Sequence, residues 1–535
     1  MTAPKPPRPP ARSAPALPGA RKPPKPKALK IASVDVGTNS IHTIIAEVHP
    51  DGSFEVVDRF KELVRLGHEI SESHGMSPRA IADGLAALVR TKSLCDSHQV
   101  DRILAAATSA VREAPNGAEF LNLVHKQTGI RIPIVTAHEE ARLVHLAVAR
   151  SLQFNERRAL IIDIGGGSVE FIVGSQDELF YVDSVKCGVL RLSQQAPLSD
   201  PPTRAEIERL QLHIATQCAR VVEEVKQVGF DFVVGTAGTV LALLQQVEGV
   251  GRGGKLNHAV VPRRRLEQVR DRLAALAAPE RAKLSGLSAQ RVDTIVPGAV
   301  LLTTIMRLFD AAELHGCVWG LREGVLIDHL ERHRRTIKAA PSQPDPRRRS
   351  VLALLGRCNW HEKHSRQVAS LALMLFDHAR ALHGLGPAER RLLEYGAYLH
   401  DIGYVINAED HHKHGRYIII NAGLLGFDPR EVQILGALAR YHRGRLPRKK
   451  DIEIEGLARA DQRLVGLLGG LLRIGDGLDR THNSIVDRVD CDLRDGGFEV
   501  IVSAHGDAEH EMLHARMKSD LLAETLEIPV RLRLA

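Results

Sequence analysis

Several features that a chain of this length could carry are scarce or missing. Aromatic residues make up 4% of the 535 residues, and only two are tryptophans. No run approaches the roughly 20 uninterrupted apolar residues that a membrane-spanning helix needs. The six cysteines lie far apart with no CxxC pair, so neither a disulfide framework nor a cysteine zinc site is expected. The first residues lack the apolar segment of a secretory signal. The sequence predicts a protein of the reducing cytoplasm without membrane contact.

The charge of the chain is concentrated at its N-terminus. Eight of the 72 Lys and Arg residues and ten of the 27 prolines lie in residues 1–30, which contain no acid. The rest of the chain holds 64 residues of each sign and is formally neutral. Residues 1–29 are therefore predicted to be a disordered, extended arm, either a solubilising tail or an attractor for a polyanion. The neutral body argues against nucleic-acid binding.

From residue 30 the chain carries two similar cycles of strands and helices. The first predicts strands at 30–36, 41–48, 53–57, 103–107 and 132–135 and helices at 78–95, 115–127 and 139–151. The second predicts strands at 159–164, 169–173, 179–185 and 231–234 and helices over 203–228. Each cycle contains a strand, an Asp-x-Gly turn, two more strands and a helix. This is a weak internal repeat of α/β units.

The C-terminal part has a different pattern. A Pro-rich polar stretch near residue 340 is followed by an almost entirely helical, His-rich pattern to about residue 487, then by a strand at 498–503 and a helix at 518–526. Six blocks result: the arm 1–29, α/β units 30–155 and 156–337, a linker 338–349, an all-α domain 350–495 and a small α+β unit 496–535.

Two glycine-containing turns, each directly after a buried strand, carry the first chemical signal. The candidate phosphate-binding residues there are Gly37, Thr38, Asn39, Ser40, Gly165, Gly166, Gly167 and Ser168, and the candidate metal-binding acids are Asp35, Asp163 and Glu170. Successive backbone N–H groups form an anion-binding concavity, and glycine lets a phosphate approach the backbone. Carboxylates at strand ends suit Mg²⁺. A structural turn would explain either motif alone but not the pair, so a phosphate and magnesium site is predicted.

Three further segments are candidates for the same site. Gly235, Thr236, Gly238 and Thr239 form a third Gly/Thr loop at a strand end. Arg112 could donate two hydrogen bonds to a phosphate or be a solvated surface arginine. Glu139 and Glu140 begin a helix, where acids often only complement the helix dipole. One of them could instead be the general base for a water that attacks phosphorus.

Together these residues resemble the exopolyphosphatase / guanosine-pentaphosphate phosphohydrolase family, within the superfamily of acetate and sugar kinases, actin and the actin-like heat-shock chaperones. The resemblance runs from about Lys30 to Asp328. It also includes Arg65-Leu66-Gly67, residues 107–117 (ATSAVREAPNG), residues 138–143 (HEEARL), Arg291-Val292-Asp293, Pro297-Gly298 and Leu321-Arg322-Glu323-Gly324.

The resemblance implies a fold and residue roles. It implies two ribonuclease-H-like (actin-like) domains with the site in the cleft between them. Glu140 would orient or deprotonate the attacking water, and Arg112 would neutralise the transferred group. Asp35, Asp163 and Glu170 would hold Mg²⁺, or Mn²⁺ in its place. Positioning and electrostatics carry most of phosphoryl-transfer catalysis, which fits these roles.

The C-terminal half resembles the HD-fold region of the long members of this family. His364, His400, Asp401 and Asp476 match its H…HD…D metal pattern, with His411, His412, His414 and His442 nearby. Imidazole and carboxylate ligands suit transition metals or magnesium. Either this domain holds a second divalent metal, or it is degenerate and forms a basic channel wall and dimer contact for long polyphosphate.

The predicted activity is Mg²⁺-dependent release of terminal orthophosphate from inorganic polyphosphate. Hydrolysis of guanosine pentaphosphate (pppGpp) in the same cleft is the close alternative, since the motifs do not separate the two. A non-catalytic protein that senses nucleotide or polyphosphate is a further alternative, which the intact acids argue against. The resemblance also implies a homodimer.

Overall fold

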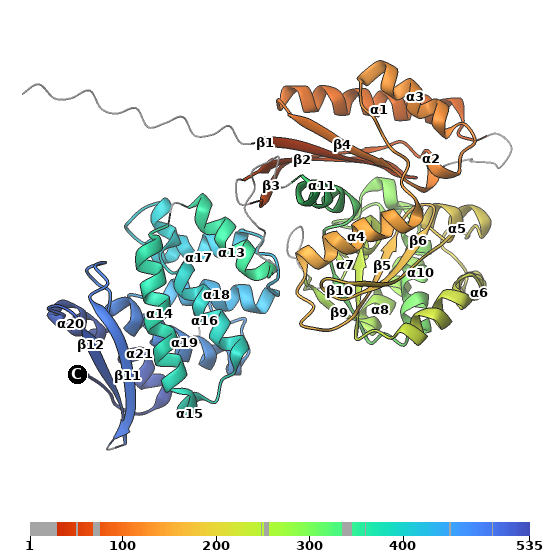
Figure 1. The fold of residues 1–535 in the computed structure, drawn as a ribbon. Helices are drawn as coiled ribbons and strands as arrows, with labels where there is room; N and C mark the ends of the chain where they lie inside the picture. Colours follow the sequence, from red (N-terminus) through yellow and green to blue (C-terminus); the bar gives the residue numbers. More distant parts are fainter. Residues whose placement is uncertain are drawn as a thin grey trace, which may run out of the picture.

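The computed structural model describes residues 29–49, 52–67, 75–247, 249–250, 256–333, 345–358, 360–448, 451–494 and 496–535. The predicted basic arm, apart from Leu29, lies outside these residues. Among them, no helix combines the length and the apolar character that crossing a bilayer requires. Two mixed sheets with their helices form the N-terminal half, and a mainly helical body forms the C-terminal half (Figure 1).

The first sheet has four strands in the order β3-β2-β1-β4. They are β1 (Leu29–Val36), β2 (Ser40–Val48), β3 (Phe54–Leu63) and β4 (Arg102–Ala107), and only the β1–β4 pairing is parallel. Side chains alternate between the two faces of a strand. Val34 and Val36 therefore pack against α1 (Pro78–Ser97) and α3 (Gly117–Thr128), while Ile31 faces the other way. The short helix α2 (Ser109–Glu113) follows β4.

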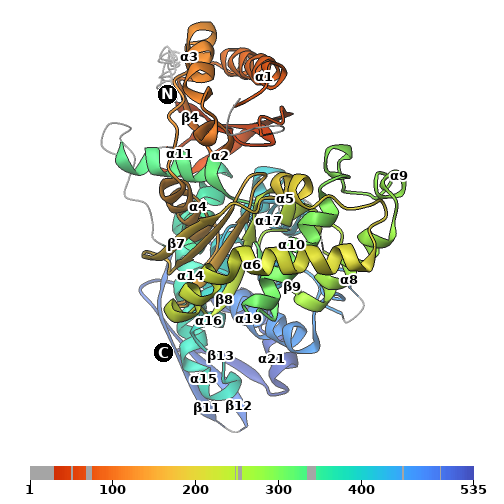
Figure 2. The ribbon, with the colours of Figure 1, turned by 90° about the vertical axis from the view of Figure 1, so that its right-hand side faces the viewer.

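The second sheet has six strands in the order β7-β6-β5-β8-β10-β9. They are β5 (Ala159–Ile164), β6 (Val169–Gly174), β7 (Leu179–Val185), β8 (Phe232–Thr236), β9 (Val260–Pro262) and β10 (Glu313–Gly316). The accompanying helices are α5 (Val189–Gln195), α6 (Arg204–Val228), α7 (Ala237–Leu244), α8 (Arg263–Ala275), α9 (Ala278–Arg281) and α10 (Ile295–Leu308). Leu160 and Ile162 belong to the core shared with α6, α8 and α10, whereas Ile161 belongs to the core on the opposite face. Figure 2 shows these three helices packed close together.

Two helices do not pack on the sheet of the α/β unit in which they lie in the sequence. Each packs on the sheet of the other unit. Helix α4 (Ala137–Ser151) lies within the range 30–155, yet Val144 and Val148 belong to the core of the second sheet. Helix α11 (Leu321–Arg332) lies in 156–337, but Leu326 and Leu330 pack against Ile31 and other residues of the first sheet. Figure 1 shows α11 beneath β1–β3 and α4 beside the second sheet. Each α/β layer is therefore completed by a helix from the other half of the repeat.

The crossing of α4 and α11 leaves no room for a side chain at Gly324. A Cβ added there would lie 2.0 Å from the carbonyl oxygen of Leu143, which is a backbone atom. We expect Gly324→Ala to destabilise the protein by about 1–3 kcal/mol, since overpacking at a backbone contact must move one of the helices. Differential scanning calorimetry should show a melting temperature lowered by several degrees.

Gly356 in α13 (Pro346–Arg357) provides the matched control. It is also a helical glycine, but nothing lies within 4 Å of an added Cβ. Gly356→Ala should leave the melting temperature unchanged or raise it slightly, because alanine favours helix more than glycine does. Equal effects of the two substitutions would contradict the close crossing.

The C-terminal half contains a helical body and a three-stranded sheet. Its helices are α13, α14 (Glu362–His378), α15 (Arg380–His383), α16 (Pro387–Leu399), α17 (His411–Asn421), α18 (Pro429–Tyr441) and α19 (Arg459–Gly477), with a 3₁₀ turn at Ile402–Val405. The sheet, in the order β11-β12-β13, consists of β11 (Val486–Arg494), β12 (Gly497–Ala504) and β13 (Val530–Leu534), accompanied by α20 (Glu509–Met517) and α21 (Asp520–Leu526).

The structure differs from the sequence-based expectations at three places. The stretch 132–135 forms only an isolated bridge, between Ile134 and Ala107, instead of a strand. Of the expected linker, residues 338–344 lie outside the described residues, and α13 already begins at Pro346 because Asp345 caps it. Strand β11 falls inside the range expected to be all-α, and apolar residues of the three-stranded sheet share one core with the helices.

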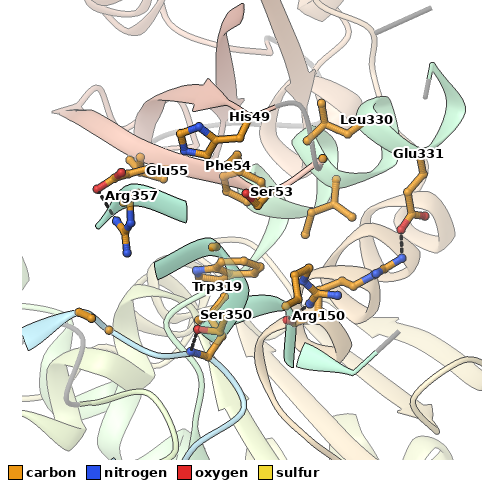
Figure 3. A pocket seen from close by; sticks show the side chains of 18 of the residues that line it. His49, Ser53, Phe54, Glu55, Arg150, Trp319, Leu330, Glu331, Ser350 and Arg357 are labelled. Atoms are coloured by element: carbon orange, nitrogen blue, oxygen red, sulfur yellow. Dashed lines mark hydrogen bonds and ion pairs between the residues drawn. The ribbon is translucent and has the colours of Figure 1, made fainter. Parts of the chain in front are cut away.

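The two halves of the chain meet at a cavity of about 290 Å³ formed by β3, α11 and α13. The rings of Phe54 and Trp319 stack there with their centroids 5.4 Å apart. Arg357 of α13 forms an ion pair of 2.8 Å with Glu55 of the first sheet (Figure 3). The ion pair thus joins the helical body to the N-terminal half, whereas the aromatic stack lies within the N-terminal half.

Candidate active site

A cavity of about 450 Å³ lies between the two sheets, where the turns after β1 and β5 face each other. Strands β1 and β5 each turn back into an antiparallel neighbour. In both turns the glycine N–H after the strand donates to the carbonyl oxygen three residues later, from Gly37 to Ser40 (3.2 Å) and from Gly165 to Ser168 (3.0 Å). The weak sequence repeat therefore corresponds to one turn geometry built twice.

The two turns touch across the cavity. A Cβ added to Gly166 would lie 3.3 Å from Cβ of Thr38, and one added to Gly167 would lie 3.1 Å from its Oγ1. The turn at 165–167 is also covered by Gly188, whose added Cβ would meet backbone atoms of Gly166 and Gly167 at 2.5 Å. Glycine is thus required at 166, 167 and 188, because the two turns and the segment at 188 approach so closely that a side chain would not fit between them.

Most of the predicted site residues line this one cavity. These are Asp35, Gly37, Thr38, Asn39, Ser40, Glu140, Asp163, Gly165, Gly166, Gly167, Ser168, Glu170, Thr236, Gly238 and Thr239. Gly235 lies behind the lining, where an added Cβ would lie 2.7 Å from the Val240 side chain. Arg112 is also outside the lining but contacts Glu140.

Four of the side chains that line the cavity are carboxylates, and they lie close to one another. Asp163 and Glu170 face each other across the β5–β6 pairing, Asp35 is the second-last residue of β1, and Glu140 lies in the first turn of α4. Burial raises the pKa of Asp35 to about 6. Burial also raises the pKa values of Glu140 and Asp163 well above their ordinary range, and the nearby charge of Glu170 raises both further. A cation would relieve this repulsion.

The acids also have fixed orientations. Glu170 accepts hydrogen bonds from the hydroxyls of Ser168 (2.6 Å) and Ser184 (3.0 Å). Glu140 accepts one from Nη1 of Arg112 at 3.0 Å, and the same Arg112 nitrogen donates to the carbonyl oxygen of Val135 at 2.8 Å. Arg112 thus fixes the carboxylate of Glu140 from the side that faces away from the cavity.

These acids fit a divalent metal of the hard type. Asp35 Oδ1 is buried and accepts no hydrogen bond. The donors that converge with it, on Asp163 and Glu170, are carboxylate oxygens, which are the ligands that Mg²⁺ prefers. The residues present therefore suit Mg²⁺ or Mn²⁺, and no cysteine lines the cavity among the described residues.

Three cationic side chains of the cavity, and a histidine whose pKa burial holds well below its usual value, were not predicted from the sequence. His42, Lys61, Arg291 and Arg322 all line it. His42 and Lys61 are opposite each other in the β2–β3 pairing, and Nδ1 of His42 lies 3.3 Å from Nη1 of Arg322. The two arginines belong to motifs that carried the family resemblance, which was the available signal. His42 and Lys61 gave none, because only the strand pairing brings them to the cavity.

The third Gly/Thr loop is in close contact with one of these side chains, Arg291. Gly238 has the guanidinium of Arg291 stacked on it, since an added Cβ would lie 2.0 Å from Nη2. Ala237 has a φ of 66° in the left-handed region, which is uncommon for a residue with a side chain. Strained backbone of this kind concentrates at functional sites. The loop therefore packs against the guanidinium of Arg291, which lines the cavity.

The His/Asp residues predicted in the C-terminal half also come together. His364 Nε2 lies 3.8 Å from an oxygen of Asp401 and 3.6 Å from one of Asp476, and His400 Nε2 lies 3.4 Å from Asp401. His364, His400 and Asp401 form a group able to hold a metal ion. Their elements, α14, α16 and α19 with the 3₁₀ turn, contribute nothing to the cavity between the sheets.

Comparisons with known proteins agree with this geometry. Residues 44–333 match the Ppx/GppA phosphatase family, and residues 347–524 match domain III of Ppx/GppA phosphatases. A guanosine-5'-triphosphate,3'-diphosphate pyrophosphatase of Vibrio vulnificus is 27% identical over 417 residues, which cover 77% of this chain and 80% of that protein. A homologous enzyme of Vibrio atlanticus is also 27% identical, with 78% and 81% covered.

Solved structures resemble the N-terminal half. The Ppx/GppA family member of Aquifex aeolicus is 27% identical with a TM-score of 0.50, covering 57% of this chain and 98% of that one. An exopolyphosphatase of Cytophaga hutchinsonii is 24% identical with a TM-score of 0.54, covering 56% and 98%, and supports the fold. The expected mixed α/β, actin-like fold with a helical C-terminal domain is thereby confirmed.

Phosphatases of this family generally depend on a divalent metal, in keeping with the acid cluster. The family match spans more than half of the chain, and its motifs converge on one cavity with acids, glycine turns and cations. The chain therefore belongs to the Ppx/GppA phosphatase family and is a hydrolase of phosphoanhydride bonds.

Proposed function

We propose that this chain is an exopolyphosphatase, which releases terminal orthophosphate from inorganic polyphosphate. The observation that carries the proposal is that one cavity is lined both by four carboxylates (Asp35, Glu140, Asp163, Glu170) and by the cationic groups of Lys61, Arg291 and Arg322. A chain of phosphates bears charge along its whole length. The cationic groups would bind the phosphoryl groups that follow in the chain, and the carboxylates with their metal would receive the terminal one.

The roles of the residues follow from their positions. Asp35, Asp163 and Glu170 would hold Mg²⁺, or Mn²⁺ in its place, which neutralises charge on the transferred phosphoryl group. Backbone N–H groups of the two glycine turns would bind phosphoryl oxygens. Glu140 would take a proton from the water that attacks the terminal phosphorus. The bridging P–O bond then breaks, and its oxygen becomes the new end of the shortened chain.

The raised pKa of Glu140 suits this role. A general base works best when its pKa lies near the working pH, and burial beside Glu170 raises the pKa of Glu140 well above its usual range. Arg112 keeps the carboxylate oriented and limits this rise. Arg112 is thus proposed to have two roles: it orients Glu140, and it neutralises charge on the transferred phosphoryl group.

Hydrolysis of pppGpp in the same cavity is the second candidate. It is favoured by the curated Vibrio relatives, which are named as pyrophosphatases of this nucleotide. Against it, the described residues that line the cavity include no Phe, Tyr or Trp on which a guanine base could stack. A non-catalytic sensing protein is the third candidate, and the complete acid cluster speaks against it.

Phosphate release measured side by side on long polyphosphate and on pppGpp tests the proposal. A kcat/KM that is at least tenfold higher for polyphosphate, per chain end, is the expected result. A preference for pppGpp would transfer the assignment to the second candidate. No release from either substrate with Mg²⁺ or Mn²⁺ would favour a sensing protein.

Lys61 should make polyphosphate binding depend on pH. Partial burial of its ammonium group in the cavity, with Arg291 and Arg322 nearby, lowers the pKa of Lys61 to about 8. Above this pH the side chain loses its positive charge, so KM should rise as the pH passes from 7 to 9. Steady-state kinetics across this range measure the effect.

Lys61→Arg is the matched variant, because an arginine keeps its charge throughout this range. The rise of KM with pH should be clearly smaller in the variant, with kcat little changed at pH 7. An identical pH profile in both proteins would show that Lys61 does not contact the substrate.

We also propose that the helical domain is HD-like and that the protein acts as a cytoplasmic homodimer. The convergence of His364, His400, Asp401 and Asp476 supports the first part. The six cysteines, none of them in a disulfide, agree with a reducing compartment. Light scattering on the purified chain would determine the oligomeric state.

A further inference from the structure

His42 occupies the same place in the first sheet as Glu170 does in the second. His42 lies opposite Asp35 in the β1–β2 pairing. Glu170 lies opposite Asp163 in the β5–β6 pairing. Each of the two also follows the serine that ends its glycine turn by two residues. The internal repeat therefore places an imidazole in one half and a carboxylate in the other.

In both halves the residue at this position contacts the hydroxyl group of the turn serine. Ser168 donates a hydrogen bond to Oε1 of Glu170 at 2.6 Å, so the proton of this hydroxyl is already used. Ser40 Oγ lies 2.7 Å from Nε2 of His42. Here the direction of the hydrogen bond depends on which ring nitrogen of His42 carries the proton.

Arg322 determines the tautomer of His42. Nη1 of Arg322 lies 3.3 Å from Nδ1 of His42. A guanidinium group has only donors, so Nδ1 must accept and carries no proton. A neutral imidazole then carries its proton on Nε2. The imidazole stays neutral because burial, with Arg322, Lys61 and Arg291 nearby, holds the pKa of His42 well below its usual value.

The position of Arg322 is fixed by the packing of α11 on the first sheet. Arg322 is the second residue of this helix, which comes from the other half of the repeat. The fully buried hydroxyl of Ser33 on β1 donates to the carbonyl oxygen of Arg322 at 2.8 Å. The contact between Arg322 and His42 is therefore part of the fold itself.

The Ser40 hydroxyl is thus left with its own proton to donate. A serine hydroxyl has one donor and two acceptor positions, and the Nε2–H group of His42 fills one acceptor position. Among the residues that the structure describes, no acceptor for the Ser40 proton is found, although Ser40 lines the cavity between the sheets. Accepting a hydrogen bond also polarises a hydroxyl and strengthens its own donation.

We propose that His42 is a positioning residue that makes Ser40 a hydrogen-bond donor to the terminal phosphoryl group. This inference rests on the proposed exopolyphosphatase function. Arg322 fixes the tautomer, His42 donates to Ser40, and Ser40 donates to a phosphoryl oxygen. In the second half of the repeat, Glu170 takes the proton of Ser168 and uses its carboxylate for the metal. The repeat thus supplies one hydroxyl donor for the phosphate and one carboxylate for the cation.

Two substitutions of His42 separate the donation to Ser40 from the other contacts of the side chain. The amide of Gln reaches the position of Nε2 and still donates, whereas the shorter amide of Asn reaches only the position of Nδ1. We expect kcat for phosphate release to fall roughly tenfold or more in His42→Asn and less than about threefold in His42→Gln. KM should change little in both, because Lys61 and Arg291 bind the phosphoryl groups that follow. His49→Asn, at a histidine outside this cavity, should change neither constant.

Ser40→Ala tests whether the effect of His42 passes through the hydroxyl. This substitution should itself lower kcat roughly tenfold or more, and adding His42→Asn should lower kcat by no more than about twofold further. Losses that multiply in the double variant would show that His42 acts independently of Ser40 and would overturn the proposal. An undiminished kcat in His42→Asn would also overturn it, as would equal losses in His42→Asn and His42→Gln at an unchanged melting temperature.

The tautomer is measured independently of activity. Nitrogen-15 NMR of the unsubstituted chain with labelled histidines distinguishes a protonated from an unprotonated ring nitrogen, and the His42 signals are assigned by their loss in His42→Gln. A proton on Nε2 and none on Nδ1 at pH 7 is the expected result. The opposite tautomer, or an imidazolium ion, would overturn the proposal. An unsubstituted enzyme that prefers pppGpp would instead overturn the proposed function, and the variants would then be compared on that nucleotide.

Discussion

Replacing Glu140 by Gln is expected to lower kcat for phosphate release by about 10²–10⁴-fold, the range that general-base catalysis contributes. The amide keeps the size of the side chain and one acceptor oxygen for Arg112, but it cannot take a proton from water. It also removes one of four buried, mutually repelling carboxylates, so the fold should not weaken. Phosphate release and thermal unfolding, measured on the same preparation, check both expectations.

Glu139→Gln is the matched control for this substitution. Glu139 is the preceding residue on α4 and pairs with Arg142 at 2.7 Å, outside the lining of the cavity. The change should leave kcat within about twofold, because a partly exposed ion pair contributes little. A Glu140→Gln enzyme that retains full turnover would remove Glu140 from the proposed mechanism, and equal losses in both variants would point to damage to α4 instead.

The second large effect is expected for Asp163→Asn. Asp163 is the second-last residue of β5 and lies opposite Glu170, and the amide replaces a charged, proposed metal ligand with a neutral one. We expect kcat/KM at physiological Mg²⁺ to fall at least 100-fold. The Mg²⁺ concentration for half-maximal activity should rise at least tenfold, since cation affinity depends on the number of charged ligands. Activity is measured as a function of Mg²⁺ concentration, together with the melting temperature with and without Mg²⁺.

Asp183→Asn serves as the comparison for Asp163→Asn. Asp183 lies on β7 of the same sheet, where it pairs with Arg220 of α6 and does not line the cavity. Its substitution should leave the Mg²⁺ dependence unchanged. If Asp163→Asn also left the half-saturating Mg²⁺ concentration unchanged, the metal would have to be held by other residues.

Local structure was largely predictable because it depends on short-range patterns. The strands around Asp35 and Asp163 and the long helices showed clear periodicity, and their bounds differ by a few residues at most places. The placement of α4 and α11 was not predictable, because both are amphipathic and either sheet could bury their apolar faces. The stretch 132–135 is apolar enough for a strand, but it meets a partner only at Ala107.

The site residues likewise divide into those that the sequence could predict and those that it could not. The glycine turns and their acids are consecutive in sequence, so their chemistry could be predicted from the residues alone. Lys61 and His42 could not, because they come to the cavity through strand pairing and each is a common polar residue in a strand. Likewise, the H…HD…D spacing predicted a metal group around Asp401, but only the packing of α17 against the 3₁₀ turn brings His411 to the same carboxylate.

The exchange of α4 and α11 restricts how the cavity can open. The chain passes between the two sheets near residue 136 and again near residue 320, at the start of each exchanged helix. Arg142 of α4 and Asp328 of α11 bind each other at 2.7 Å. Two connecting segments allow the two sheets to bend relative to each other about the line that joins the segments. They resist twisting and sliding of one sheet against the other. Opening would therefore follow a single hinge, and the two glycine turns would return to the same register at every closure.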